Sequence, residues 1–322
     1  MATIIKTQPS NADFLKKLNS LLEGELPRLD GGLARAASYH FRSSGKAFRA
    51  RLAFSSGQAL GLNEQDNLHW AAACELLHNA SLIHDDISDA STHRRGQQSI
   101  NQYFGSDVAL CLGDWMVAKA FELGARNNRH GAKLVALLAR SMQDTCHGQT
   151  SDITQRTHAP IHIWRRIAAG KTAPLLIAPV KGAALAADLT EDLFSLEKLI
   201  TLCGLVYQGR NDIDDIVPSS HRSSDLHGRK PNLVITLFID HCLGGENFSN
   251  WYGSNDISRV KHWQTRISSS DAISRADNLI DLWLEGAADL IPNTPNPLQN
   301  IACELVSSVR QRVVTKRQGQ IA

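Results

Sequence analysis

Apolar residues recur at spacings of three and four positions along most of this 322-residue chain. That spacing gives a helix one apolar face, whereas the strict alternation of apolar and polar residues typical of half-buried strands is nearly absent. The pattern predicts helices over residues 13–25, 47–61, 67–84, 107–125, 132–147, 161–186, 191–216 and 231–242. We therefore predict an all-α protein.

Clusters of Gly, Ser, Pro and Asn separate these helices and predict loops. They lie at 43–46, 93–98, 157–160, 217–225 and 244–256. Long helices joined by short loops favour one large bundle over two domains, and we predict a single domain over residues 1–322. The final stretch, from Arg310 onward, has the composition of a solvated basic end.

Composition and charge exclude several classes of protein. The 34 Lys and Arg residues nearly balance the 32 Asp and Glu residues, which argues against a nucleic-acid partner because such binding needs a strong field of one sign. No apolar run approaches the roughly 18 residues of a membrane helix. The segment MATIIKTQPSNADF lacks the apolar core of a secretory signal. We expect a cytoplasmic protein without an integral membrane segment.

The first candidate functional residues lie in the segment HDDISD at 84–89. Asp85, Asp86 and Asp89 lie at i, i+1 and i+4, so a helix brings the three carboxylates close together. Like charges at this spacing repel each other, and a cation relieves that repulsion. Hard oxygen ligands without thiols or a histidine pair indicate Mg²⁺, with Mn²⁺ as the alternative. An Asp-rich turn is the competing interpretation of this cluster taken alone.

A second acidic segment favours a metal site over an Asp-rich turn. Asn211, Asp212 and Asp215 repeat the same spacing over a hundred residues later, again after an apolar run, and Asp214 adds another carboxylate. Two such clusters facing each other across a bundle would hold metal ions and a polyphosphate between them. We predict a shared metal site to which Asp212 and Asp215 contribute.

A phosphorylated substrate also requires fixed cations. Lys46 and Arg49 lie one turn apart at the start of a predicted helix, where backbone N–H groups add positive potential. Arg94 and Arg95 follow the first acidic cluster, and the planar fork of arginine matches phosphate oxygens. Each of these residues alone is more often a solvated surface charge. Further candidates of the same kind are Lys171 and Lys230.

Two other positions allow alternative interpretations. His78 lies seven residues before Asp85, two helical turns away on the same face, and is either a buried structural histidine or a diphosphate contact. The step Gly170-Lys171-Thr172 is not a P-loop, because that motif requires glycine where Arg165 stands.

Taken together, these residues resemble the trans-isoprenyl diphosphate synthases, also called polyprenyl synthetases. The resemblance covers roughly residues 40–235. The segments that carry it are, in order, GKAFR at 45–49, ELLHNASLIHDDISD at 75–89, RRG at 94–96, FGSDVALCLGDWMVAKAF at 104–121, GQTSD at 148–152, GKT at 170–172, YQGRNDIDD at 207–215 and DLHGRK at 225–230. It implies an isoprenoid-synthase-type helical bundle around a deep central cavity, a homodimer and three Mg²⁺ ions.

The resemblance also implies a role for each matching residue. Two metal ions are implied to bind Asp85, Asp86 and Asp89, and the third to bind Asp212 and Asp215. The allylic diphosphate is implied to contact Arg94, Lys171, Thr172, Gln208 and Lys230. Isopentenyl diphosphate is implied to contact Lys46, Arg49, His78 and Arg95. The residues expected to matter most for catalysis are Asp85, Asp86, Lys171 and Gln208.

The implied reaction is a head-to-tail condensation. Metal ions and cations stabilise the departing diphosphate, and isopentenyl diphosphate attacks the resulting allylic carbocation in a water-poor cavity. Two alternatives on this fold are a class I terpene cyclase or atypical condensing enzyme, and a weakened partner subunit. The cyclase pattern NDxxSxxxE is disfavoured because Asp215 and Ser219 stand where it requires Ser and Glu.

Four positions depart from the family pattern. Asn211 replaces an Asp and removes one negative charge, and Ser220 replaces a Lys and removes one cation. Asn232 replaces a Thr or Ser, and Ala47 replaces a basic residue. These departures bear on activity, and on the partner-subunit alternative, more than on the fold.

Small residues before the first acidic cluster bear on product length. In this family a bulky aromatic residue five positions before the first Asp blocks elongation, and Ala80 stands there with Ser81 beside it. Candidates for the floor of the cavity are Leu77, Ala73, Trp115 and Phe121. We predict a geranylgeranyl or longer product.

Overall fold

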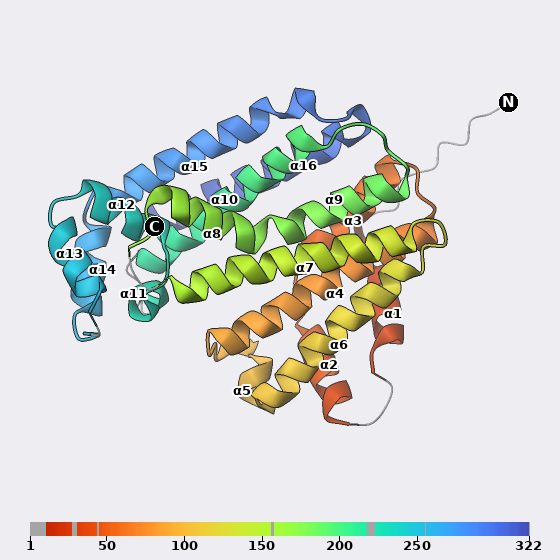
Figure 1. Ribbon diagram of the computed structural model, residues 1–322, viewed down its shortest axis with the longest axis horizontal. Coiled ribbons are helices and arrows are strands. Elements are labelled where there is room, and N and C mark those ends of the chain that lie inside the picture. Colours follow the sequence, from red (N-terminus) through yellow and green to blue (C-terminus); the bar gives the residue numbers. More distant parts are fainter. Residues whose placement is uncertain are drawn as a thin grey trace. The chain divides into compact units, whose positions relative to one another are not determined.

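The computed structural model describes residues 11–27, 31–43, 45–155, 158–217, 223–254 and 256–321. Within these ranges every regular element is a helix except for one two-stranded hairpin, so the predicted all-α class is confirmed. The α-helices labelled in Figure 1 are α1 (Asn11–Glu25), α2 (Gly32–Arg42), α3 (Phe48–Ala59), α4 (Glu64–Ser88), α5 (Ile100–Phe104), α6 (Ser106–Ala125), α7 (Gly131–Thr154), α8 (Ile161–Thr172), α9 (Pro174–Ala186), α10 (Phe194–Ile216), α11 (Ser224–Gly228), α12 (Leu233–His241), α13 (Gly245–Tyr252), α14 (Val260–Ser268), α15 (Ala272–Asp289) and α16 (Gln299–Ile321). The hairpin strands are β1 (His93–Arg94) and β2 (Gln97–Gln98), and two 3₁₀ turns, η1 (Ile291–Asn293) and η2 (Asn296–Leu298), precede α16.

The chain divides into two compact units. Unit 1 comprises Met1–Arg140 and Ala178–Leu189, and unit 2 comprises Ser141–Ile177 and Thr190–Ala322. The single domain expected from the loop lengths stays a prediction, as does the deep central cavity. Across the described ranges, no helix has the length and apolar character needed to cross a membrane.

Unit 1 is built around the long helix α4, which packs against α3 and α6. The helix begins where the Asn63 side chain accepts the backbone N–H of Asp66 at 2.9 Å, a standard N-cap. Its middle is buried, and Trp70 donates from Nε1 to the carbonyl of Pro179 at 2.8 Å. The approach of Gly182 to this indole leaves no room for a Cβ, which would lie 1.9 Å from the ring. These contacts fix the helix that carries the first acidic segment at its end.

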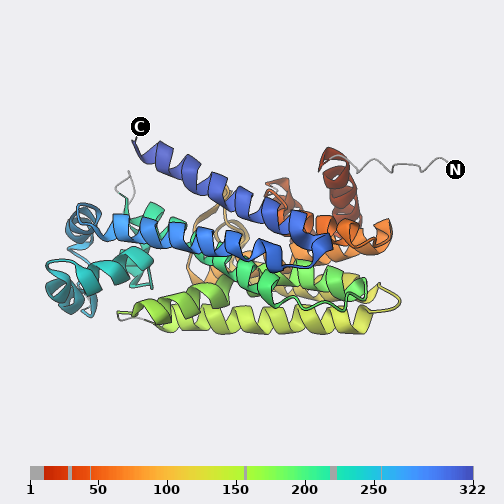
Figure 2. The ribbon, with the colours of Figure 1, turned by 90° about the horizontal axis from the view of Figure 1, so that it is seen from above.

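Unit 2 is built around α10, which packs against α8, α12, α15 and α16. The rings of Trp164 and Trp283 stack in its core with centroids 5.7 Å apart. Figure 2 shows α16 returning alongside α15 after the two 3₁₀ turns, and the two helices contact each other. The second acidic segment forms the last part of α10.

Several details of the predicted elements are wrong. The single helix expected over 161–186 is two helices, because Pro174 lacks a backbone N–H and begins a new helix at the position where proline is favoured. The loop expected over 244–256 contains α13, whose Phe248 and Trp251 are buried. The loop at 93–98 is a hairpin, and the basic end is helical up to Ile321.

Two sequence predictions fall on parts of the chain that are not described. The first ten residues of the segment MATIIKTQPSNADF and the departure at Ser220, within 218–222, are outside the described residues. All six cysteines of the chain lie within the described ranges, and each is a free thiol.

Candidate functional site

The first acidic segment lies at the C-terminal end of α4. Asp85 and Asp86 belong to the last turn, and Asp89 follows it, with its N–H donating to the carbonyl of Asp85 at 2.9 Å. Asp86 is only 4% exposed, and Arg94 donates to its carboxylate from Nη2 at 2.5 Å and from Nε at 3.1 Å. Asp85 and Asp89 are half-buried. The three carboxylates therefore differ, since Asp86 is paired with a guanidinium inside the protein.

A tight hairpin returns Arg94 to this carboxylate. The two residues of its turn, Arg95 and Gly96, have φ of +53° and +79°, as a two-residue turn between right-twisted strands requires. The first strand then ends with Arg94 beside Asp86. A small cavity opens between Asp86, Arg94 and Arg95, with His40 in its wall. The RRG step thus folds back onto the acidic segment that precedes it.

Arg95 contacts the loop that leads into α3. It donates from Nη1 to the carbonyl of Ser43 at 3.2 Å, and a Cβ at Gly45 would lie 2.6 Å from its Nη2. A side chain at position 45 would therefore displace the Arg95 guanidinium, which gives the first residue of the GKAFR segment a packing role. The exposed Lys46 comes next in the chain, and the half-buried Arg49 lies in the first turn of α3. The structure therefore brings Arg95 next to the predicted isopentenyl diphosphate segment.

His78 lies among the arginines of unit 1. Burial lowers its pKa well below the usual value, and the positive charges of Arg49, Arg95 and Arg94 lower it further. Its Nδ1 atom is buried without a hydrogen-bond partner among the described residues. A neutral imidazole surrounded by guanidinium groups is a favourable environment for an anion. The predicted grouping of His78 with Arg49 and Arg95 is thus present in unit 1.

A buried polar network that joins α4 to α2 and α3 was not predicted from the sequence. Glu75, 5% exposed, accepts the backbone N–H of Ala50 at 3.2 Å and a hydrogen bond from Asn79 Nδ2 at 3.3 Å. Asn79 Oδ1 in turn lies 2.8 Å from His40 Nε2. The signal for this network was a charged residue within the apolar part of ELLHNASLIHDDISD. The network holds the first turn of α3, where Arg49 lies.

In unit 2, Asp212 is held from one side. Its Oδ2 atom accepts the indole N–H of Trp164 at 2.8 Å and the backbone N–H of Leu233 at 2.7 Å. Among the described residues, its Oδ1 atom accepts one long hydrogen bond of 3.3 Å, from Gln208 Nε2. The side chain is 2% exposed. One oxygen is thus fixed by two strong donors, while the other keeps most of its capacity for a ligand.

Asp215 organises the turn that begins α11. Its carboxylate accepts the backbone N–H and the hydroxyl of Ser224 at 2.9 and 2.8 Å, and also the hydroxyl of Ser223. A further, longer hydrogen bond of 3.3 Å comes from the N–H of Asp225. Asp215 thereby positions Asp225 close to the acidic segment.

Four buried or partly buried acids interact in this part of unit 2. Burial and the neighbouring carboxylate of Asp225 raise the pKa of Asp212 well above its usual value. Burial and the nearby carboxylates of Asp215 and Asp152 raise the pKa of Asp225 to about 7. Lys171 offsets part of this charge, with its Nζ 2.7 Å from Asp152 Oδ2, and the charge of Lys230 lowers the pKa of Asp225. This group of carboxylates thus takes up a proton, or a cation, more readily than free carboxylates do.

Sequence reasoning gave Asp152 and Asp225 no role, although both lie in segments that carry the family resemblance. GQTSD ends in Asp152, and DLHGRK begins with Asp225. Thr172 ends α8 directly after Lys171 and is half-buried. The structure thus brings Lys171, Gln208 and Asp212 into one region of unit 2, as predicted, and adds two acids to it.

The donors present fit Mg²⁺ in kind. Among the described residues, no three His, Cys, Asp or Glu side chains gather closely enough to hold an ion together. Mg²⁺ in proteins usually takes one or two carboxylates and completes its shell with water and phosphate oxygens. The half-buried Asp85 and Asp89 and the Oδ1 atom of Asp212 supply hard oxygen ligands of that type. The raised pKa values in unit 2 show carboxylates that a divalent cation would stabilise.

Replacing Trp164 with Phe is expected to weaken divalent-metal binding about tenfold. Phe retains a ring to stack on Trp283 but removes the N–H that Asp212 accepts, and a hydrogen bond to a charged group contributes about 1.5–3 kcal/mol. Mn²⁺ titration followed by electron paramagnetic resonance measures this change. Trp263→Phe is the matched control, because the Trp263 indole is buried but its N–H has no partner among the described residues. Equal effects of the two changes would contradict the role given to Trp164.

Comparison with known proteins agrees with these features. The polyprenyl synthetase family model matches residues 31–267. A short chain isoprenyl diphosphate synthase of Methanothermobacter thermautotrophicus is 33% identical over 218 residues, which are 65% of this chain and 67% of that protein. A geranylgeranyl pyrophosphate synthase of Geoglobus acetivorans is 29% identical over 241 residues, or 69% and 72% of the two chains. The crystal structure of a heptaprenyl diphosphate synthase from Staphylococcus aureus shares the fold, with a TM-score of 0.81 at 23% identity over 94% of this chain and 99% of that chain.

The fold and the two acidic segments define a helical prenyltransferase. The family match extends over well more than half of the chain, and the protein belongs to the polyprenyl synthetase family. The resemblance inferred from the motifs is therefore confirmed.

Proposed function

We propose that this protein is a Mg²⁺-dependent trans-prenyltransferase that condenses an allylic diphosphate with isopentenyl diphosphate head to tail. The products are a longer all-trans prenyl diphosphate and diphosphate. The observation that carries the proposal is the grouping in unit 1 of the Asp86–Arg94 pair with Arg95, Arg49 and a neutral His78. Carboxylates for metal ions and cations for a second diphosphate thus adjoin each other in one part of the fold.

In this proposal the residues of unit 2 bind the allylic diphosphate. Lys171 and Lys230 contribute point charges, and Thr172 and Gln208 contribute hydrogen bonds. Arg94 belongs to unit 1, and the family resemblance assigns its planar fork to the same ligand. Asp152 restrains the ammonium group of Lys171, so that little reorganisation is needed when the substrate binds. Asp85, Asp89 and Asp212 would hold Mg²⁺, which would neutralise charge on the diphosphate and so assist the departure of diphosphate as the leaving group.

The residues around α3 bind isopentenyl diphosphate in this proposal. Arg49 and Arg95 supply the positive charge, with Lys46 beside them in the chain. His78 is neutral because of its lowered pKa, so it donates or accepts a hydrogen bond without adding charge. Family membership further supports a homodimer in the cytoplasm, which light scattering and cell fractionation test.

The direct test is incubation of the purified protein with isopentenyl diphosphate, Mg²⁺ and a panel of allylic diphosphates. A longer prenyl diphosphate is expected, and failure with every allylic primer would overturn the proposal. Release of a hydrocarbon from farnesyl diphosphate alone would favour the cyclase. Activity of the protein without any other chain would dismiss the weakened partner subunit.

Replacing Ser81 with Phe is expected to shorten the main product by one or more five-carbon units. Ser81 is half-buried on α4 beside the fully buried Ala80, one turn before Asp85, so a ring there reduces the length available to a growing chain. Product chain length by chromatography is the measurement. Ser81→Ala is the control, because it removes the hydroxyl without adding bulk. An unchanged product distribution in Ser81→Phe would show that the chain grows elsewhere, and the geranylgeranyl or longer product would lose its support.

A further inference from the structure

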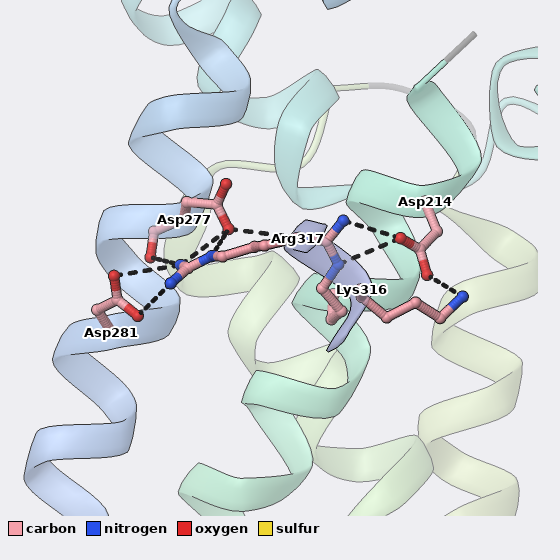
Figure 3. A network of polar contacts seen from close by, with 6 residues as sticks. Asp214, Asp277, Asp281, Lys316 and Arg317 are labelled. Atoms are coloured by element: carbon pink, nitrogen blue, oxygen red, sulfur yellow. Dashed lines mark hydrogen bonds and ion pairs between the residues drawn. The ribbon is translucent and has the colours of Figure 1, made fainter. Parts of the chain in front are cut away.

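Helix α16 lies outside the residues matched by the family model, yet it contacts α10. Figure 3 shows how it is held: Arg317 lies between Asp277 and Asp281 of α15, and Lys316 reaches Asp214. The Arg317 nitrogens are 2.9 Å from Asp277 and 3.0 Å from Asp281, and Lys316 Nζ is 3.0 Å from Asp214. These ion pairs fix α16 beside the acidic segment of α10.

Arg312, on the same helix, contacts the residue with which that segment opens. It donates from Nη2 to Asn211 Oδ1 at 3.0 Å, and its guanidinium carbon lies 4.3 Å from the centre of the Tyr207 ring. Tyr207 and Asn211 are one turn apart on α10, so they form one docking face for the arginine. The Nε atom of Arg312 is buried without a hydrogen-bond partner among the described residues. The guanidinium is thus held in place while part of its donor capacity remains unused.

The two residues of this contact change the local charge in the same direction. The amide of Asn211 is neutral, and a neutral amide oxygen is a weaker ligand for a hard divalent cation than a carboxylate. Arg312 adds a fixed positive charge within hydrogen-bonding distance of that amide, and this charge repels a metal ion. Arginine is also well suited to bind phosphate oxygens. The Arg312–Asn211 contact therefore disfavours binding of a divalent metal ion but favours binding of a diphosphate.

We propose that Arg312 takes the place of a metal ion at the opening of the second acidic segment. It binds a diphosphate oxygen of the substrate directly, so this chain binds one divalent ion fewer at that position than it would with aspartate at 211. This inference rests on the proposed function, because it takes diphosphate to be the ligand.

The experiment compares Arg312→Gln, Asn211→Asp and the double variant Asn211→Asp/Arg312→Gln with the unchanged protein. Inorganic diphosphate is titrated by calorimetry at fixed Mn²⁺, and bound Mn²⁺ is counted by electron paramagnetic resonance with saturating diphosphate. We expect Arg312→Gln to weaken diphosphate binding about tenfold, as the loss of a charge-assisted hydrogen bond predicts. We expect the double variant to bind one more Mn²⁺ per chain than the unchanged protein. Asn211→Asp alone is expected to gain no ion, because Arg312 pairs with the new carboxylate.

Lys316→Gln is the matched control from the same helix. Lys316 contacts Asp214, which Arg210 also holds at 2.9 Å, so its loss is expected to change neither the diphosphate affinity nor the ion count. Should Arg312→Gln not fold, Arg312→Lys decides the question: it keeps the charge but lacks the fork, and diphosphate affinity falls only if Arg312 binds the ligand.

Equal ion counts in the unchanged protein and the double variant, or an unchanged diphosphate affinity in Arg312→Gln, would overturn the inference. Prenyl transfer by the unchanged protein is measured in parallel. If transfer is normal and the ion counts are equal, only the role of Arg312 fails. If the unchanged protein neither transfers prenyl groups nor binds diphosphate with Mn²⁺, the proposed function fails as well.

Discussion

Replacing Asp85 with Asn is expected to lower kcat at least about 1,000-fold, because removal of one preorganised electrostatic group commonly costs about that much. The change keeps the shape of the side chain but gives the metal ion a neutral, weaker ligand. The free energy of unfolding, in contrast, is expected to rise. Asp85 lies at the negative end of the α4 dipole and one turn from Asp89, so removing its charge stabilises the helix by a few tenths of a kcal/mol.

A lower kcat together with a higher stability distinguishes a catalytic carboxylate from a structural one. Steady-state kinetics and urea denaturation of the same preparations measure the two quantities. Asp144→Asn, at an exposed position of α7, is the control and is expected to change neither. An Asp85→Asn variant with more than a tenth of the original kcat would remove Asp85 from the metal site.

The neighbouring change Asp86→Asn is expected to reduce both activity and stability. Asp86 is buried and receives two nitrogens of Arg94, so the amide leaves a half-buried guanidinium without its counter-charge. Losing a partner of this kind costs about 1–3 kcal/mol. The comparison of Asp85 with Asp86 thus distinguishes two adjacent residues that the sequence treats alike.

The parts of the site that follow from helical periodicity were predictable from the sequence. The i, i+1, i+4 spacing placed Asp85, Asp86 and Asp89 at the end of one helix, and the order of the motifs indicated the family. Periodicity did not reveal the break at Pro174, because proline is as acceptable in the first turn of a new helix as any apolar residue. The apolar pattern therefore runs without a gap across the boundary between α8 and α9.

Contacts between distant segments were not predictable from local pattern. Arg312 and Arg317 suggested a solvated basic end, because their partners Asn211 and Asp277 belong to other helices. The interpretation of that end as solvated is wrong for these two residues. Burial and the carboxylate of Asp215 raise the pKa of Asp225, and Asp152, far away in the sequence, raises it further. The fold brings Asp152 close.

Replacing Gly148 with Ala is expected to lower the free energy of unfolding by about 2–3 kcal/mol, because the close crossing of α7 and α8 has no space for a methyl group. A Cβ at 148 would lie 2.3 Å from the carbonyl carbon of Gly170 and 2.4 Å from the backbone nitrogen of Lys171. Both are main-chain atoms, so the clash cannot be relieved by a side-chain rotation. The two helices must separate.

The same separation is expected to lower kcat/KM about 100-fold, since a misplacement of about 1 Å costs that much at a catalytic site. Asp152 lies one turn after Gly148, and its 2.7 Å contact with Lys171 spans the crossing. Gly286→Ala on α15 is the control. Among the described residues beyond its own helix, its Cβ would meet Leu202 at an ordinary contact distance of 3.6 Å, and alanine stabilises a helix interior by up to about 1 kcal/mol. Thermal denaturation measures the effect on stability, and steady-state kinetics of both variants measure kcat/KM. If Gly148→Ala melts like the unchanged protein and keeps its kcat/KM, the crossing does not position Lys171.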